Sequence, residues 1–197
     1  MHVDSKVRWV WVLYVVTALG VAASIASAFA ASESWKIDPA HTAIGFSIDA
    51  TGFPTTEGRF TRFDGRIAID LKAPEKSRIA FHVDAGSVNV GASSFSDYLR
   101  SPAFLDVARH PSIDFVSTSV EKANDSTIRV NGELTLLGVT KPLSVDVIVT
   151  KLPSNGKLRF GFRAEAEIDR LAFGMNSGFP LIARDVSLRI ASEADEL

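Results

Sequence analysis

Apolar and polar residues alternate one by one in run after run of this 197-residue chain. Such a period of two places apolar side chains on one face of a β-strand and polar side chains on the other. Turns rich in Gly, Pro, Asn and Asp separate the runs, so the sequence predicts antiparallel strands with one dry and one wet face. About eight strands of this kind form either a sandwich or a closed barrel. The alternation is clear at residues 44–49, 67–72, 79–84, 143–150, 158–169 and 186–190, and rougher at 113–120 and 128–136.

One segment, residues 94–107, has a helical period instead. Ser94 with Asp97 three residues later resembles a capping box, and Phe95, Tyr98 and Leu99 fall on one helical face. Pro102 is expected to end this helix or to begin another short one. We therefore predict a short helical connection between two strands, which plugs one end of a barrel.

Residues 1–30 have the order of a secretory signal peptide: a basic start with Lys6 and Arg8, an apolar stretch at 9–21, and small residues before Ala31. Two A-x-A cleavage patterns are present, at 26–28 and 28–30. The alternative is an uncleaved anchor, since residues 9–31 are long enough to span a bilayer. Either way, residues 31–197 are expected to form one domain outside the cytoplasm.

Charge and cysteine content exclude several classes of protein. The formal net charge is −2, which argues against a nucleic-acid partner, because neutralising phosphates needs a surplus of Lys and Arg. The chain has no cysteine, so a disulfide scaffold, thiolate metal ligands and a cysteine nucleophile are excluded. His41, His82 and His110 are isolated in sequence, and we expect no metal site and no cofactor.

A catalytic site is not expected either, because no nucleophile elbow or phosphate-binding loop is present. Asp169 and Asp185 are the candidate carboxylate pair, although ion pairs with Arg170 or Arg184 or a capping role are the simpler interpretation. A hydrolase would require two of His41, Asp169 and Asp185 to converge within hydrogen-bond reach.

Phenylalanine is abundant, with 13 Phe against two Tyr, and many Phe lie on the apolar faces of predicted strands. A small barrel is either filled by such side chains or holds one small ligand. Ala164 and Ala166 are small inward residues beside large Phe, and they favour an elongated apolar channel suited to a chain-like lipid. Because pattern does not measure volume, the filled core and the lipid pocket both remain open.

Six pieces of the sequence, in order, resemble the YceI-like family. They are residues 35–42 (WKIDPAHT), 58–65 (GRFTRFDG), 87–91 (SVNVG), 98–107 (YLRSPAFLDV) leading to His110 and Pro111, 130–142 (VNGELTLLGVTKP) and 169–175 (DRLAFGM). One departure is that Ser96 stands before Asp97, where the family commonly has Arg. The resemblance implies a periplasmic, lipocalin-like barrel that binds a polyisoprenoid or another long apolar chain, such as a quinone tail or a fatty amide, without catalysis.

The candidate ligand-binding residues are the inward apolar side chains and the predicted helix. They are Phe46, Ile48, Phe60, Phe63, Phe81, Val83, Leu99, Phe104, Phe115, Leu134, Leu136, Phe160, Phe162, Phe173 and Met175. Arg100 and Arg170 are candidates for binding a polar head, although a structural ion pair is the commoner role of Arg. The expected partner is an isoprenoid or acyl lipid, with a homodimer possible and no nucleic acid or metal. The alternative is a structural or surface-interaction protein with a filled barrel and an exposed apolar patch.

Overall fold

The computed structural model describes residues 34–37, 39–68, 70, 73–153 and 159–196. The predicted signal peptide and its cleavage site lie outside the described residues. Residues 31–197 form one compact unit by themselves. Within the part of the chain that the structure describes, no helix is both long enough and apolar enough to cross a membrane.

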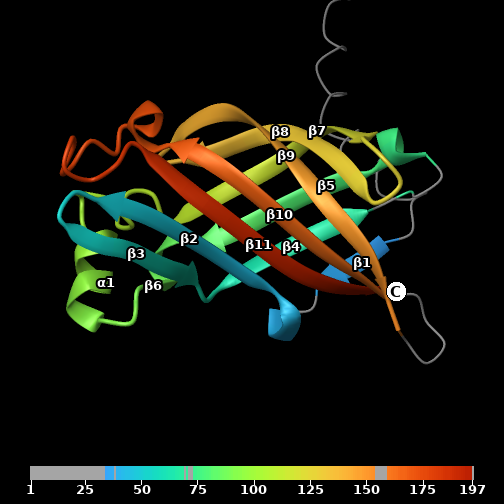
Figure 1. Cartoon of the computed structure of the whole chain (residues 1–197), viewed down its shortest axis with the longest axis horizontal. Helices are drawn as coiled ribbons and strands as arrows, with labels where there is room; N and C mark the ends of the chain where they lie inside the picture. Colours follow the sequence, from blue (N-terminus) through green and yellow to red (C-terminus); the bar gives the residue numbers. More distant parts are fainter. Residues whose placement is uncertain (1–33, 38, 69, 71–72, 154–158, 197) are drawn as a thin grey trace, which may run out of the picture. The chain divides into compact units, whose positions relative to one another are not determined.

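The fold is mainly β, and all of its strand pairs are antiparallel (Figure 1). Four short 3-10 helices, η1 (Pro39–His41), η2 (Pro74–Lys76), η3 (Ala85–Ser87) and η4 (Arg170–Phe173), and one α-helix, α1 (Ser93–Arg100), connect the strands. The strands are β1 (Ser34–Ile37), β2 (Ala43–Ala50), β3 (Phe53–Phe60), β4 (Phe63–Ala68), β5 (Arg78–Asp84), β6 (Val88–Asn89), β7 (Ser112–Lys122), β8 (Thr127–Leu136), β9 (Val139–Leu152), β10 (Arg159–Asp169) and β11 (Asp185–Glu196).

The sheet closes on itself through β1, which pairs with β4 on one side and with β11 on the other. The order β1-β4-β5-β7-β8-β9-β10-β11 is therefore a ring of eight strands, while β2, β3 and β6 extend from β11. Closure removes the edges of the ring itself, and the edge that remains on the extension is β6, a strand of two residues. The predicted antiparallel barrel of about eight strands is confirmed, and the sandwich is not formed.

Strand β3 is a strand that the sequence did not predict. Residues 52–54 read as a turn, and Pro54 and Gly58 both weaken a strand pattern. The structure shows why glycine is needed at position 58, which pairs directly with Phe46 of β2. A Cβ on Gly58 would lie 2.2 Å from Cζ of Phe46, so the bare strand makes room for the phenylalanine ring.

Helix α1 is shorter than predicted, and it begins differently. It begins at Ser93 and ends at Arg100, and turns rather than helix follow up to residue 109. The predicted capping box is wrong, because the N-cap is Ala92, and Asp97 accepts a hydrogen bond from Nη1 of Arg100 at 2.6 Å instead. Pro102 stops the helix, since its ring cannot continue one.

Arg100 fastens the helix to the sheet. Its Nε donates to the carbonyl of Gly86 and its Nη2 to that of Val88, both at 2.7 Å. Helix α1 consequently lies beside β3 and β6, at the same end of the barrel as the loop between β10 and β11 (Figure 1).

Two clusters of buried apolar side chains occupy the barrel. The first consists of Ile67, Ile79, Val120, Ile128, Val130 and Phe162. The second, which includes residues after α1, consists of Ile44, Phe60, Val83, Val88, Leu105, Leu134, Leu136, Ile168 and Phe173. Burial of these side chains supplies the main stabilisation of a domain without disulfides.

Candidate functional site

The barrel contains a cavity of about 660 Å³, a volume typical of sites for small organic ligands. Of the 40 described residues that line it, only Thr56, Glu165, Arg170 and Ser192 have polar side chains. Members of both core clusters line the cavity, so it runs along the barrel. Along β10 the wall continues from Phe162 to Ile168, a span of about 20 Å at the usual rise per strand residue.

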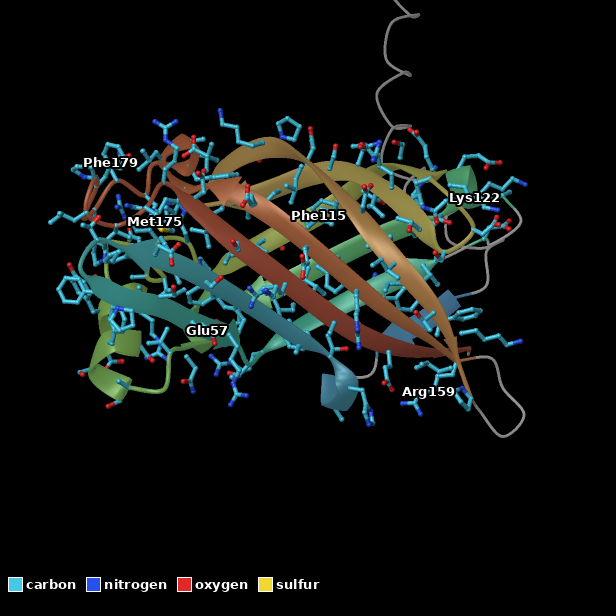
Figure 2. The ribbon with its side chains drawn as sticks, in the orientation of Figure 1. Glu57, Phe115, Lys122, Arg159, Met175 and Phe179 are labelled. Carbon is cyan, nitrogen blue, oxygen red and sulfur yellow. The ribbon has the colours of Figure 1, made fainter. Side chains whose placement is uncertain are left out.

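Most of the predicted site residues lie in this wall. Figure 2 labels two of them, Phe115 midway along the barrel and Met175 near the end that carries α1. The predicted residues that line the cavity are Phe46, Ile48, Phe60, Phe81, Val83, Leu99, Phe104, Phe115, Leu134, Leu136, Phe162 and Met175. Their binding to a lipid stays a prediction, but the structure brings them to one surface.

Three predicted residues are not among those that line the cavity. Phe173 is buried in the second cluster, and Phe63 packs against the same cluster. Phe160 packs against the first cluster. All three pack in or against the buried clusters, because an apolar alternation identifies the dry face of a strand but not which of its side chains border the cavity.

The small residues that the sequence singled out on β10, Ala164 and Ala166, do line the cavity. Gly132 on β8 also helps to keep the cavity open. A Cβ there would lie 2.5 Å from Cζ of Phe115 and 2.6 Å from the carbonyl oxygen of Val116. The Phe115 ring therefore lies over a bare strand. A larger side chain at 132 would push that ring away from the wall and into the cavity.

Sequence reasoning missed the residues at one end of the cavity. Phe53 and Pro54 from the start of β3, Phe95 from α1, and Leu181 and Ile182 from the loop between β10 and β11 all line it. Alternation predicts which side chains point into the barrel only within predicted strands, and these residues lie in segments that the sequence indicates as turns, loops or helix. The available signal was apolar residues beside Pro in otherwise turn-like segments.

The sequence suggested two roles for Arg170, binding a polar head group and forming a structural ion pair, and the structure shows a different one. Its side chain is fully buried and lines the cavity, and its donors are directed at four backbone carbonyls, at 2.5–2.9 Å. Burial lowers the pKa of this guanidinium, but Arg keeps its charge in proteins. It therefore holds the loop between β10 and β11 in place, and the carbonyls that it bonds belong to Met175, Ser177, Ile182 and Ala183.

Of the three groups considered for catalysis, Asp169 and Asp185 face each other across two strands, whereas His41 lies far from both. Asp169 and Asp185 pair across β10 and β11, but Asp169 also lies 3.6 Å from Arg184 and accepts a hydrogen bond from the amide of Leu171. His41 precedes β2, whose first residue pairs with β11 six residues, or about 20 Å, beyond Asp185. Among the described residues, no group of three or more His, Asp or Glu side chains is arranged to hold a metal ion.

His82 lies on the outer face of the barrel, where its Nδ1 is 2.6 Å from Oδ1 of Asp114. This hydrogen bond and the charge of Asp114 raise the pKa of His82 above its ordinary value of 6.5. The pair therefore stabilises the fold below pH 6.5, and this contribution is lost as the pH rises through the raised value.

We expect the variant His82→Gln to be less stable than the parent chain below pH 6.5 by about 0.2–1 kcal/mol, because both partners are largely exposed. The difference should shrink at higher pH. Urea unfolding of both proteins across this range measures it, and a difference that grows with pH would contradict the assignment.

Comparison with known proteins agrees with this architecture. Residues 35–194 match the model of the YceI-like domain. The chain is 35% identical to UPF0312 protein ECA1782 of Pectobacterium atrosepticum over 179 residues, covering 90% of this chain and 93% of the relative. It is 33% identical to Protein YceI of Salmonella arizonae over 169 residues, covering 83% and 87%.

Two solved structures share the fold. BcnA of Burkholderia cenocepacia superposes with a TM-score of 0.74 at 22% identity, covering 80% of this chain and 98% of that chain. A polyisoprenoid binding domain from Saccharophagus degradans, implicated in plant cell wall breakdown, superposes with a TM-score of 0.65 at 14% identity, covering 84% and 99%. The domain match includes every residue that lines the cavity, and this chain belongs to the YceI-like family.

Proposed function

We propose that this chain is an exported protein that holds one long apolar lipid in its barrel, for sequestration or transport, and carries out no chemistry on it. The observation that carries the proposal is the elongated apolar cavity, since a filled barrel would leave no such space. A polyisoprenoid fits best, and a quinone tail or a fatty amide shares the same chemistry. The polyisoprenoid binding domain with the same fold supports this choice, and the signal-like leader supports a periplasmic location.

The wall of the cavity determines how such a ligand is recognised. Each buried CH₂ group contributes about 0.8 kcal/mol, and ordering the chain offsets part of this gain. The described donors of Arg170, the most buried polar side chain in the wall, go to backbone carbonyls. Selection should therefore depend on the length and width of the apolar chain more than on its head group.

A lipid extract of the protein tests the proposal. The full chain is expressed in a bacterium that processes its leader, purified without detergent and extracted with organic solvent for mass spectrometry. We expect one reproducible isoprenoid or acyl species in about a one-to-one ratio with the protein. An unrelated exported protein of similar size, purified in parallel, controls for lipid carried over from the cell.

The proposal would be overturned by a protein that is empty on purification and also fails to bind an added polyprenol. A polyprenyl ester can be added in a separate assay. Its hydrolysis or other conversion by the protein would instead support the alternative that the chain is a hydrolase.

A further inference from the structure

The end of the barrel that carries α1 exposes a group of large apolar side chains. We call this group the rim, and it consists of Phe53, Phe95, Tyr98, Phe179 and Leu181. These side chains are 75%, 38%, 52%, 50% and 64% exposed. Among the described residues, the other large apolar side chains of comparable exposure are Val116 and Ile148, which lie singly on strands of the barrel wall. Five exposed apolar side chains at one end mark an interaction site.

The rim is continuous with the cavity. Phe53, Phe95 and Leu181 also line the cavity, and Tyr98 packs edge-on against Phe104, which lines it too, with ring centroids 5.1 Å apart. The rim therefore surrounds the mouth of the cavity, and a ligand that leaves the cavity at this end passes over it.

Four of the five rim side chains stand in segments without charge, and the fifth, Tyr98, lies beside Asp97 and Arg100, which form an ion pair with each other at 2.6 Å. Residues 50–56, 90–96 and 171–183 contain no Asp, Glu, Lys or Arg. The opposite end of the barrel is different, since Lys122 pairs there with Asp125, η2 carries Glu75 and Lys76, and β5 begins with Arg78. Figure 2 shows Phe179 and Met175 at one end and Lys122 and Arg159 at the other.

The rim segments are also held in a fixed shape. The amide of Thr51 donates to the carbonyl of Leu181, and the amide of Ala183 donates to that of Asp49, both at 2.8 Å. Because the turn between β2 and β3 is joined to the loop after β10, Phe53 and Leu181 present their side chains together without a large cost in ordering.

We propose that the rim docks on the surface of a lipid bilayer, so that the lipid passes between the bilayer and the cavity without crossing water. This inference rests on the proposed function, because a water-insoluble cargo is stored in membranes. Aromatic and aliphatic side chains without charged neighbours insert into the interfacial layer of a bilayer. Protein interfaces usually surround their apolar centre with charged or polar groups. Three of the rim segments supply no charge for such a border, and the charged groups beside Tyr98, Asp97 and Arg100, already pair with each other.

Vesicles of phosphatidylcholine, loaded with a fluorescent polyprenol, test the proposal. We expect the purified full chain to take up the polyprenol from these vesicles, and the double variant Tyr98→Ser/Phe179→Ser, which removes two rim side chains that do not line the cavity, to do so roughly 10-fold more slowly. Because the rim segments carry no net charge, raising the salt concentration should leave the rate nearly unchanged. The matched control is Val116→Ser/Ile148→Ser, which removes two equally exposed apolar side chains from the barrel wall and should not change the rate.

Hydrogen exchange of the backbone amides shows which residues contact the vesicles. It reports on each segment separately, so any contact made by the leader does not affect the result. Vesicles should slow exchange in residues 50–56 and 171–183 and leave the turn at 123–126 unaffected. Protection confined to other segments would overturn the proposal. A rim variant that takes up lipid as fast as the parent chain would also overturn it. So would sedimentation experiments in which the main effect of the rim variant is to convert a dimer into monomers.

Polyprenol presented in detergent separates the two proposals. The rim variant Tyr98→Ser/Phe179→Ser should bind it with the affinity of the parent chain, because neither substituted residue lines the cavity. If neither protein binds it, the proposed function fails. If both bind it and both take it up from vesicles at the same rate, only the docking proposal fails.

Discussion

Replacing Arg170 with alanine is expected to lower the free energy of unfolding by about 3 kcal/mol. The substitution removes a fully buried side chain that donates hydrogen bonds to four backbone carbonyls. A buried acceptor left without a donor costs about 1–3 kcal/mol, and the position of this loop at the cavity mouth lets water satisfy some of the four. Urea unfolding followed by circular dichroism measures the change.

The neighbouring Arg184→Ala variant is the matched control. Arg184 is exposed and lies 3.6 Å from Asp169, so its loss should cost less than about 0.5 kcal/mol. Arg170→Lys should fall between the two, because one ammonium group cannot reach four carbonyls. Hydrogen exchange in residues 175–183 should accelerate in Arg170→Ala. Equal stability of the Arg170→Ala and Arg184→Ala variants would contradict the positioning role of Arg170.

Replacing Ala164 with tryptophan is expected to abolish binding of a long polyprenol or to weaken it at least ~100-fold. Ala164 lines the cavity midway along β10, where it pairs with Val147 and Ile190 of the adjacent strands. An indole at this position fills a section of the cavity and interrupts its length. Titration of the purified protein with a fluorescent polyprenol in detergent gives the dissociation constants.

Arg163→Trp controls for the added ring, since residue 163 is exposed on the outer face of the same strand and should leave the affinity unchanged. Ala164→Leu guards against a misfolded tryptophan variant and should reduce the affinity by a smaller factor. Folding of each variant is checked by its circular dichroism spectrum. Unchanged affinity in a folded Ala164→Trp protein would show that the ligand lies elsewhere.

Much of the fold was predictable from alternation alone, and β10 shows why. Its inward residues, Phe162 to Ile168, are apolar at every second position, and the structure places them in the cavity wall. β3 was not predictable, because Gly58 and Pro54 serve contacts and turns that local pattern does not reveal. The start of α1 was mispredicted because the helix begins one residue before Ser94, with Ala92 as its N-cap, and because Asp97 pairs with Arg100 in the folded chain.

The site was predictable in part, for a related physical reason. Periodicity identifies the dry face of a strand, so it found most of the cavity wall, but it does not measure volume and could not decide whether the barrel was filled. The mouth was missed because Phe53 begins a strand that the sequence did not predict, and Leu181 lies in the loop between β10 and β11. The role of Arg170 depends on the carbonyls of a folded loop, which the sequence does not display.

The pairing of β1 with β11 has a consequence for how the molecule is made. The first and last described strands are neighbours in the ring, so the barrel closes only after residues 185–196 have been synthesised. Contacts so distant in sequence form slowly, because the whole intervening chain must be brought together first. A nascent chain therefore stays open until β11 has been synthesised, and the enclosed cavity forms only after that point.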